Sequence, residues 1–205
     1  MKTTTGSLAA LALLGVLAGC GSTDSGADSG SGADSAPDSG SDDTSAGDAA
    51  SAPAADELCP AELPDDGDGG FGVTDPATEA PDLAPVDRAW VCQYESRNGW
   101  QLVGEPVEVP QDDLAGIEES LTGLEPSDPD QMCTEELGPR WLLVTADEQG
   151  DLTGVSVDGF GCRSVRLTDS PDSTVPGRAS GGGLVEGTLS APGDLAQELS
   201  TIHGG

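Results

Sequence analysis

The sequence predicts an α+β domain over residues 58–205, with a small antiparallel sheet of about five strands and one or two packed helices. Short alternating or continuous apolar segments, separated by turn residues, indicate the strands. Two stretches with apolar side chains at three- and four-residue steps indicate the helices. Four well-spaced cysteines in the same region indicate two disulfides, which would stabilise a core of this size.

The stretch 86–109 predicts a β-hairpin. Trp90, Cys92 and Tyr94 share one face of an alternating segment. Asn98-Gly99 follows, and these two residue types suit the positive φ angles of a tight turn. The chain then returns in an extended segment, so the two strands are expected to pair with each other.

The remaining elements follow from the same patterns. A helix is predicted between residues 112 and 124, before Pro126 and Pro129 end it. The run Trp141-Leu142-Leu143-Val144 has no polar break, which predicts a strand buried on both faces. Also expected are strands over 152–157 and 162–167, a long loop over 168–188 and a closing helix near 194–202.

The first twenty residues resemble the export signal of a bacterial lipoprotein. Lys2 precedes an apolar run from Leu8 to Leu17, which is too short to span about 30 Å of hydrocarbon. Leu17-Ala18-Gly19-Cys20 is similar to the lipobox, in which the cysteine thiol receives a diacylglyceryl group. The resemblance implies a signal peptide at 1–19 and a lipidated Cys20 that anchors the protein to the extracytoplasmic face of the cell membrane.

The number of cysteines agrees with lipidation. The chain has five, so an exported form would keep an unpaired thiol unless one is consumed. With Cys20 acylated, four remain as disulfide candidates, and three connectivities are possible, of which sequential pairing gives two loops of similar length. These candidates are Cys59, Cys92, Cys133 and Cys162. No C-x₂-C pair occurs, which disfavours zinc.

Residues 20–57 are expected to form the lipidated cysteine and a disordered linker. After Cys20 this segment contains only Gly, Ser, Ala, Asp, Thr, Pro and one Glu, with nine acids and no cation. Such a composition cannot offset the entropy cost of ordering. A flexible linker of this length would span roughly 35 Å and hold the domain clear of the membrane.

The sequence indicates no catalytic residue and no cofactor. His203 is the single histidine and lies close to the C-terminus, where chains usually fray. No G-x-S-x-G surrounds a serine, and no free thiol remains as a nucleophile. The carboxylates are too numerous for spacing to single out a glycosidase pair. A secreted hydrolase acting on cell-wall or extracellular polymers is therefore the first alternative.

Three groups of residues favour structural interpretations. Asp65-Asp66-Gly67-Asp68-Gly69-Gly70 resembles the opening of a calcium loop but lacks the closing Glu, so no metal site is predicted. A calcium-dependent interaction module is the second alternative. Trp90 and Trp100, on facing strands, are expected in the core. Arg163 and Arg166 fall on opposite faces of the expected strand, so they would not form one anion clamp.

The lead-in from Cys59, the Trp90-x-Cys92-x-Tyr94 strand and the second cysteine pair resemble uncharacterised small secreted domains of high-GC Gram-positive bacteria. That resemblance implies no particular activity.

Acidity limits the partners. Seven basic residues face 38 acidic ones, a formal charge of −31, which argues against nucleic-acid binding. Neutral or cationic partners are favoured, and part of the charge is also typical of salt adaptation. The sequence thus predicts a membrane-anchored lipoprotein of the cell envelope with a non-catalytic binding or interaction module. Its ligand, specific activity and oligomeric state are not indicated.

Overall fold

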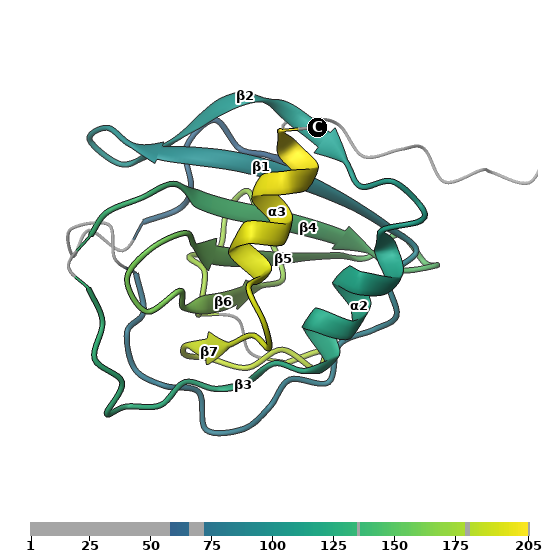
Figure 1. The fold of residues 1–205 in the computed structure, drawn as a ribbon. Helices are drawn as coiled ribbons and strands as arrows, with labels where there is room; N and C mark the ends of the chain where they lie inside the picture. Colours follow the sequence, from purple (N-terminus) through teal and green to yellow (C-terminus); the bar gives the residue numbers. More distant parts are fainter. Residues whose placement is uncertain (1–57, 66–71, 135, 179–180, 205) are drawn as a thin grey trace, which may run out of the picture. The chain divides into compact units, whose positions relative to one another are not determined.

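The computed structural model describes residues 58–65, 72–134, 136–178 and 181–204, which form one antiparallel sheet with two helices (Figure 1). The expected signal peptide and linker, residues 1–57, lie outside the described residues. The strands are β1 (Arg88–Ser96), β2 (Trp100–Glu108), β3 (Glu125–Pro126), β4 (Arg140–Ala146), β5 (Leu152–Asp158), β6 (Val165–Thr168) and β7 (Leu189–Ser190). The helices are α2 (Leu114–Thr122) and α3 (Leu195–His203).

The sheet confirms the α+β class and adds strands to the predicted number. Its order is β2-β1-β4-β5-β6-β7-β3, and every neighbouring pair is antiparallel. The described residues therefore contain seven strands where about five were expected. The additional two strands, β3 and β7, are each two residues long. They pair with each other, and β7 also pairs with β6 through Leu189 and Val165. Segments this short carry no periodic pattern, so only tertiary pairing reveals them.

The predicted hairpin is present. Ser96 pairs with Trp100, which leaves a three-residue loop between β1 and β2. Asn98 has a φ angle of 62° and Gly99 one of 123°, as the turn prediction requires. The Cβ of any larger residue at Gly99 would lie 2.3 Å from the Glu62 side chain, so the turn also depends on close approach of the lead-in.

One face of the sheet packs against both helices (Figure 1). Helix α3 crosses β1, β4 and β5 and buries Leu195 and Leu199 against them. Helix α2 buries Leu114, Ile117 and Leu121, which recur at three- and four-residue steps along the predicted range. The chain stops being helical at Gly123, ahead of the two prolines. Both predicted helices are thus confirmed within a residue or two.

The opposite face is covered by the N-terminal lead-in, residues 58–65. Cys59 forms a disulfide with Cys92 of β1, with 6.0 Å between the Cα atoms. The Tyr94 hydroxyl donates to the Pro60 carbonyl at 2.8 Å, and the Leu63 amide donates to the Trp100 carbonyl at 3.0 Å. Covalent and hydrogen bonds therefore hold this segment where it completes a second apolar layer.

Strand β4 is buried on both faces, as its uninterrupted apolar run predicts. Trp141 and Leu143 pack toward the helices, whereas Leu142 and Val144 pack toward the lead-in. The predicted strand over 162–167 is shorter than expected. It begins at Val165, because Gly161 and Arg163 have positive φ angles of 67° and 53° that place Cys162 in a turn.

Burial of Tyr94 predicts an alkaline loss of stability. Desolvation raises the pKa of its phenol above the ordinary value of about 10. Above pH 10 the unfolded chain releases this proton while the folded chain retains it, so the free energy of unfolding falls as pH rises. Tyr94 is the only tyrosine, so tyrosinate absorbance reports it alone. Titration should occur near pH 10 in urea and well above pH 10 in buffer; coincident curves would contradict this prediction.

Candidate functional site

A cavity of about 420 Å³ opens at the end of the sheet where β4 begins and β5 finishes. Two segments form most of its wall: residues 133–134 and 136–140, which lead into β4, and residues 158–162 with Ser164, which lie between β5 and β6. Residues that line it include Trp100, Leu137, Arg140, Asp158, Phe160 and Arg166. The cavity thus combines apolar walls with buried charge.

The charged lining residues are Arg140, Arg166, Asp158 and Glu136, and the first three form a hydrogen-bonded cluster. Arg140 donates from Nε to Asp158 Oδ1 at 2.8 Å, and Arg166 donates from Nη1 to Asp158 Oδ2 at 2.7 Å. Arg166 also donates from Nε to the Val73 carbonyl at 2.6 Å. The arginines are only 5% and 4% exposed. Each carboxylate oxygen of Asp158 therefore serves a different buried guanidinium.

Strand register brings these charges together. Arg140 of β4 is the direct partner of Asp158 on β5, and Ser156 of β5 is the partner of Arg166 on β6. Alternation along the strands points all three charged side chains to the face opposite the helices. The same face is apolar further along β4, at Leu142 and Val144. The sheet thus changes from apolar to charged at one end.

Arg140 lies in an environment that opposes its charge. Its guanidinium stacks on the Trp100 ring, with 4.3 Å from Cζ to the ring centroid. Burial lowers the Arg140 pKa from its usual value, and the neighbouring Asp158 and Asp65 charges act in the opposite direction. The aspartates thereby compensate a charge that the apolar surroundings disfavour.

The cavity mouth exposes apolar side chains. Among the described residues three large hydrophobic side chains are exposed, namely Met132, Leu137 and Phe160, at 97%, 63% and 45%. Leu137 and Phe160 line the cavity, and Met132 precedes the lining residue Cys133. The Phe160 ring sits on Gly138, where an added Cβ would lie 1.4 Å from a ring atom. Two of these three exposed side chains therefore line the cavity, and Met132 does not.

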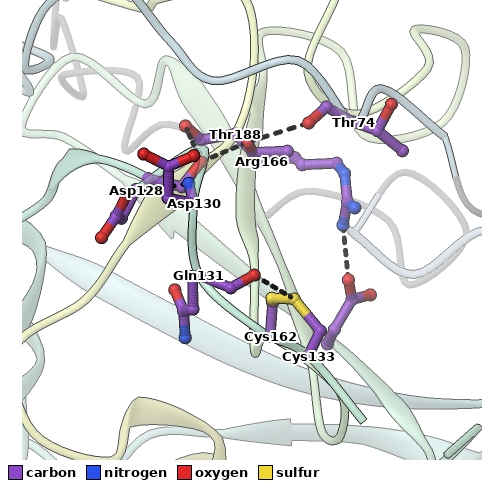
Figure 2. Close-up of a disulfide and its surroundings, with 10 residues drawn as sticks. Thr74, Asp128, Asp130, Gln131, Cys133, Cys162, Arg166 and Thr188 are labelled. Atoms are coloured by element: carbon purple, nitrogen blue, oxygen red, sulfur yellow. Dashed lines mark hydrogen bonds and ion pairs between the residues drawn. A yellow bond between two sulfur atoms is a disulfide. The ribbon is translucent and has the colours of Figure 1, made fainter. Parts of the chain in front are cut away.

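A second disulfide joins the two wall segments. Cys133 and Cys162 are bonded, with 4.7 Å between their Cα atoms (Figure 2). Figure 2 shows this bond near Arg166 and Thr74, which also line the cavity. Cys133 Sγ lies 3.5 Å from the Gln131 carbonyl oxygen. The bond keeps Leu137 and Phe160 on segments that cannot separate freely.

The other predicted site residues are the cysteines and the calcium-like sequence. The four disulfide candidates form the sequential pairs Cys59–Cys92 and Cys133–Cys162, while Cys20 lies outside the described residues. Most of the calcium-like sequence, residues 66–70, lies outside them too. The described residues contain no group of three or more His, Cys, Asp or Glu arranged to hold a metal ion. No described helix has the length and apolar character needed to cross a membrane.

His203, Trp90 and Arg163 do not contribute to the cavity. His203 lies at the end of α3, with its ring 5.5 Å from that of Trp141. Trp90 and Trp100 are buried, as predicted, in the apolar layer between the sheet and the lead-in. Trp100 also lines the cavity. Arg163 pairs with Asp194, not with the partner of Arg166, so the two arginines form no shared clamp.

Sequence reasoning missed the Arg140–Asp158 pair and the exposure of Phe160. Arg140 directly precedes the apolar run of β4, and Asp158 directly follows the apolar positions of β5. If these segments had been paired as an antiparallel hairpin, their opposite charges would have been predicted to meet. Phe160 lies between two glycines and belongs to no periodic pattern, and the structure places it at the cavity mouth.

Comparisons with known proteins do not identify a family. No family model, no curated protein and no solved structure matches this chain. The site is therefore interpreted from its own chemistry. Its guanidiniums can donate hydrogen bonds and cannot act as bases near neutral pH, while both oxygens of Asp158 already accept from arginine. This arrangement suits binding better than proton transfer.

Replacement of Asp158 by asparagine tests the compensation of the two arginines. Asp158→Asn leaves two buried guanidiniums near each other without their shared counterion. We expect the free energy of unfolding to fall by about 3 kcal/mol. Asp169→Asn is the matched control, since Asp169 is exposed, and it should change stability by less than about 0.5 kcal/mol. Urea unfolding of both variants gives the comparison; equal stabilities would contradict the structural role of Asp158.

Proposed function

We propose that this chain is a lipid-anchored extracytoplasmic protein whose folded domain is a non-catalytic binding module. In this proposal Cys20 carries the lipid, residues 21–57 form the linker, and the cavity beside Cys133–Cys162 receives the ligand. The observation that carries the binding role is the cavity itself: exposed Leu137 and Phe160 stand at the mouth of a site lined by buried charge.

The disulfide pattern supports the compartment. Disulfides persist mainly outside the cytoplasm, and the domain uses four of the five cysteines in two bonds. The remaining cysteine is Cys20, at the position where the lipobox-like sequence requires the acylated residue. Acylation would therefore leave no thiol free. This agreement comes from the folded domain, which is independent of the signal sequence.

The chemistry of the cavity supports binding over hydrolysis. A glycosidase needs one carboxyl group to donate a proton and a second to act as nucleophile or base. Asp158 is engaged by Arg140 and Arg166 through both oxygens, so it is held in place as an acceptor. Apolar side chains at a cavity mouth favour ligand binding, because contact with them removes apolar ligand surface from water.

Substitution of Cys20 tests the anchor. In producing cells, Cys20→Ser should shift the protein from the membrane fraction to the culture medium, because the variant lacks the acyl chains that supply the membrane affinity in this proposal. Fractionation and intact-mass measurement of the wild-type protein give the comparison. A wild-type mass without acyl groups, or equal membrane retention of the variant, would contradict anchoring through Cys20.

Dye binding tests the cavity. Nile red is an uncharged apolar dye whose fluorescence rises on leaving water. The expected mature chain, residues 20–205, carrying Cys20→Ser lacks both the acyl chains and the apolar run Leu8 to Leu17, which would themselves take up the dye, so it is the appropriate protein. We expect one saturable site, weakened about tenfold by Phe160→Ser because the variant loses apolar contact area. Unsaturable uptake, or unchanged affinity in the variant, would contradict binding at this cavity.

A further inference from the structure

The charges that line the cavity indicate which class of molecule fits it, an inference that rests on the proposed function. We propose that the cavity takes an uncharged, mainly apolar molecule with one hydrogen-bond acceptor, such as a hydroxyl or carbonyl oxygen, directed at Arg140 and Arg166. The apolar part of this molecule lies between Leu137 and Phe160 at the mouth.

An anionic ligand is disfavoured although two arginines are present. Both guanidiniums already share the Asp158 carboxylate, at 2.8 and 2.7 Å. Asp65 adds a second negative charge that acts on Arg140, and Glu136 adds a third to the cavity lining. An anionic group would therefore enter a site with no excess positive charge. It would also approach a domain, residues 58–205, whose 29 acids outnumber its six arginines.

A cationic ligand is disfavoured for a local reason. Beside Arg140 and Arg166 its charged group would be repelled, and both oxygens of Asp158 already accept from these arginines. Glu136, the other carboxylate of the lining, is exposed to solvent. The overall acidity of the domain attracts cations to the surface, but this attraction is screened by salt over about 8 Å. Attraction at the surface therefore does not favour a cation inside the cavity.

An uncharged acceptor avoids both penalties. Each guanidinium carries five N–H donors in a planar fork. The hydrogen bonds to Asp158 and Val73 use Nε of Arg140 and both Nε and Nη1 of Arg166. Both arginines line the cavity, and a neutral oxygen bound there can accept from one of their other N–H groups without adding charge. Such a bond fixes the orientation of an otherwise apolar molecule.

The size and position of the cavity favour a small molecule. Its volume of about 420 Å³ falls in the range of roughly 300–1,000 Å³ that is typical of small-ligand sites. The Cys133–Cys162 bond joins the two wall segments, so the walls are largely pre-formed, and pre-formed walls lower the ordering cost of binding. Leu137 and Phe160 then provide apolar area on opposite wall segments.

Three probes with the same alkyl chain separate the possibilities. Decanol, decanoate and decylammonium differ in the charge of one terminal group, and each competes with Nile red on the Cys20→Ser chain at neutral pH. We expect decanol to displace the dye at a concentration about tenfold lower than either ion. Added salt should narrow the difference between decanol and decanoate, because it screens the repulsion between decanoate and the acidic domain.

Leu137 and Met132, two exposed apolar side chains of similar size, provide the matched variants. Leu137→Ser removes apolar surface that lines the cavity, whereas Met132→Ser removes exposed apolar surface that does not line it. Decanol affinity should fall about tenfold in the first variant and remain unchanged in the second. Equal effects of the two substitutions would show adsorption to apolar surface in general and would overturn the proposal.

The outcomes distinguish the inference from the function on which it rests. If Nile red binds at one Phe160-dependent site but decanoate or decylammonium competes as well as decanol, the ligand class is wrong and the binding site stands. If neither the dye nor any of the three probes binds, the cavity is not a binding site and both proposals fail.

Discussion

Burial of β4 on both faces is the constraint on which the rest of this domain depends. The apolar run Trp141-Leu142-Leu143-Val144 places alternate side chains on opposite faces, so the sheet needs a covering layer on each. Helices α2 and α3 provide one layer, and they come from sequence that follows the hairpin. The other layer is a short lead-in with little secondary structure. Such a segment has few internal contacts, which explains why a disulfide to Cys92 holds it on the sheet.

The candidate site begins where this double covering ends. Further along β4 the face opposite the helices is closed by Leu58, Cys59 and Leu63. At the start of the strand the same face carries Arg140, beside Asp158 and Arg166. Buried charges require compensation, and here the compensation is internal to the sheet. The adjoining wall segments, which are cross-linked by Cys133–Cys162, therefore surround a cavity and do not close over an apolar core.

The sequence predicted those elements whose signals are local. The hairpin follows from alternation and from Asn98-Gly99, and both helices follow from their apolar spacing. The candidate site depends on information that is not local. Arg140 and Asp158 are 18 residues apart, and only the β4–β5 register makes them partners. The Phe160 ring packs on Gly138 of another segment, a contact that no local pattern predicts. Alternation alone predicts that β6 begins at Cys162. The positive φ angle of Arg163 prevents this, and β6 begins at Val165.

The central claim is that an uncharged apolar molecule occupies this cavity with its acceptor at the buried arginines. A crystal structure of the Cys20→Ser chain grown with decanol tests it most directly. The account predicts an alkyl chain between Leu137 and Phe160, with the hydroxyl oxygen within about 3.2 Å of a guanidinium nitrogen of Arg140 or Arg166. Decanol bound elsewhere on the domain, or bound here with its hydroxyl turned away from both arginines, would contradict it.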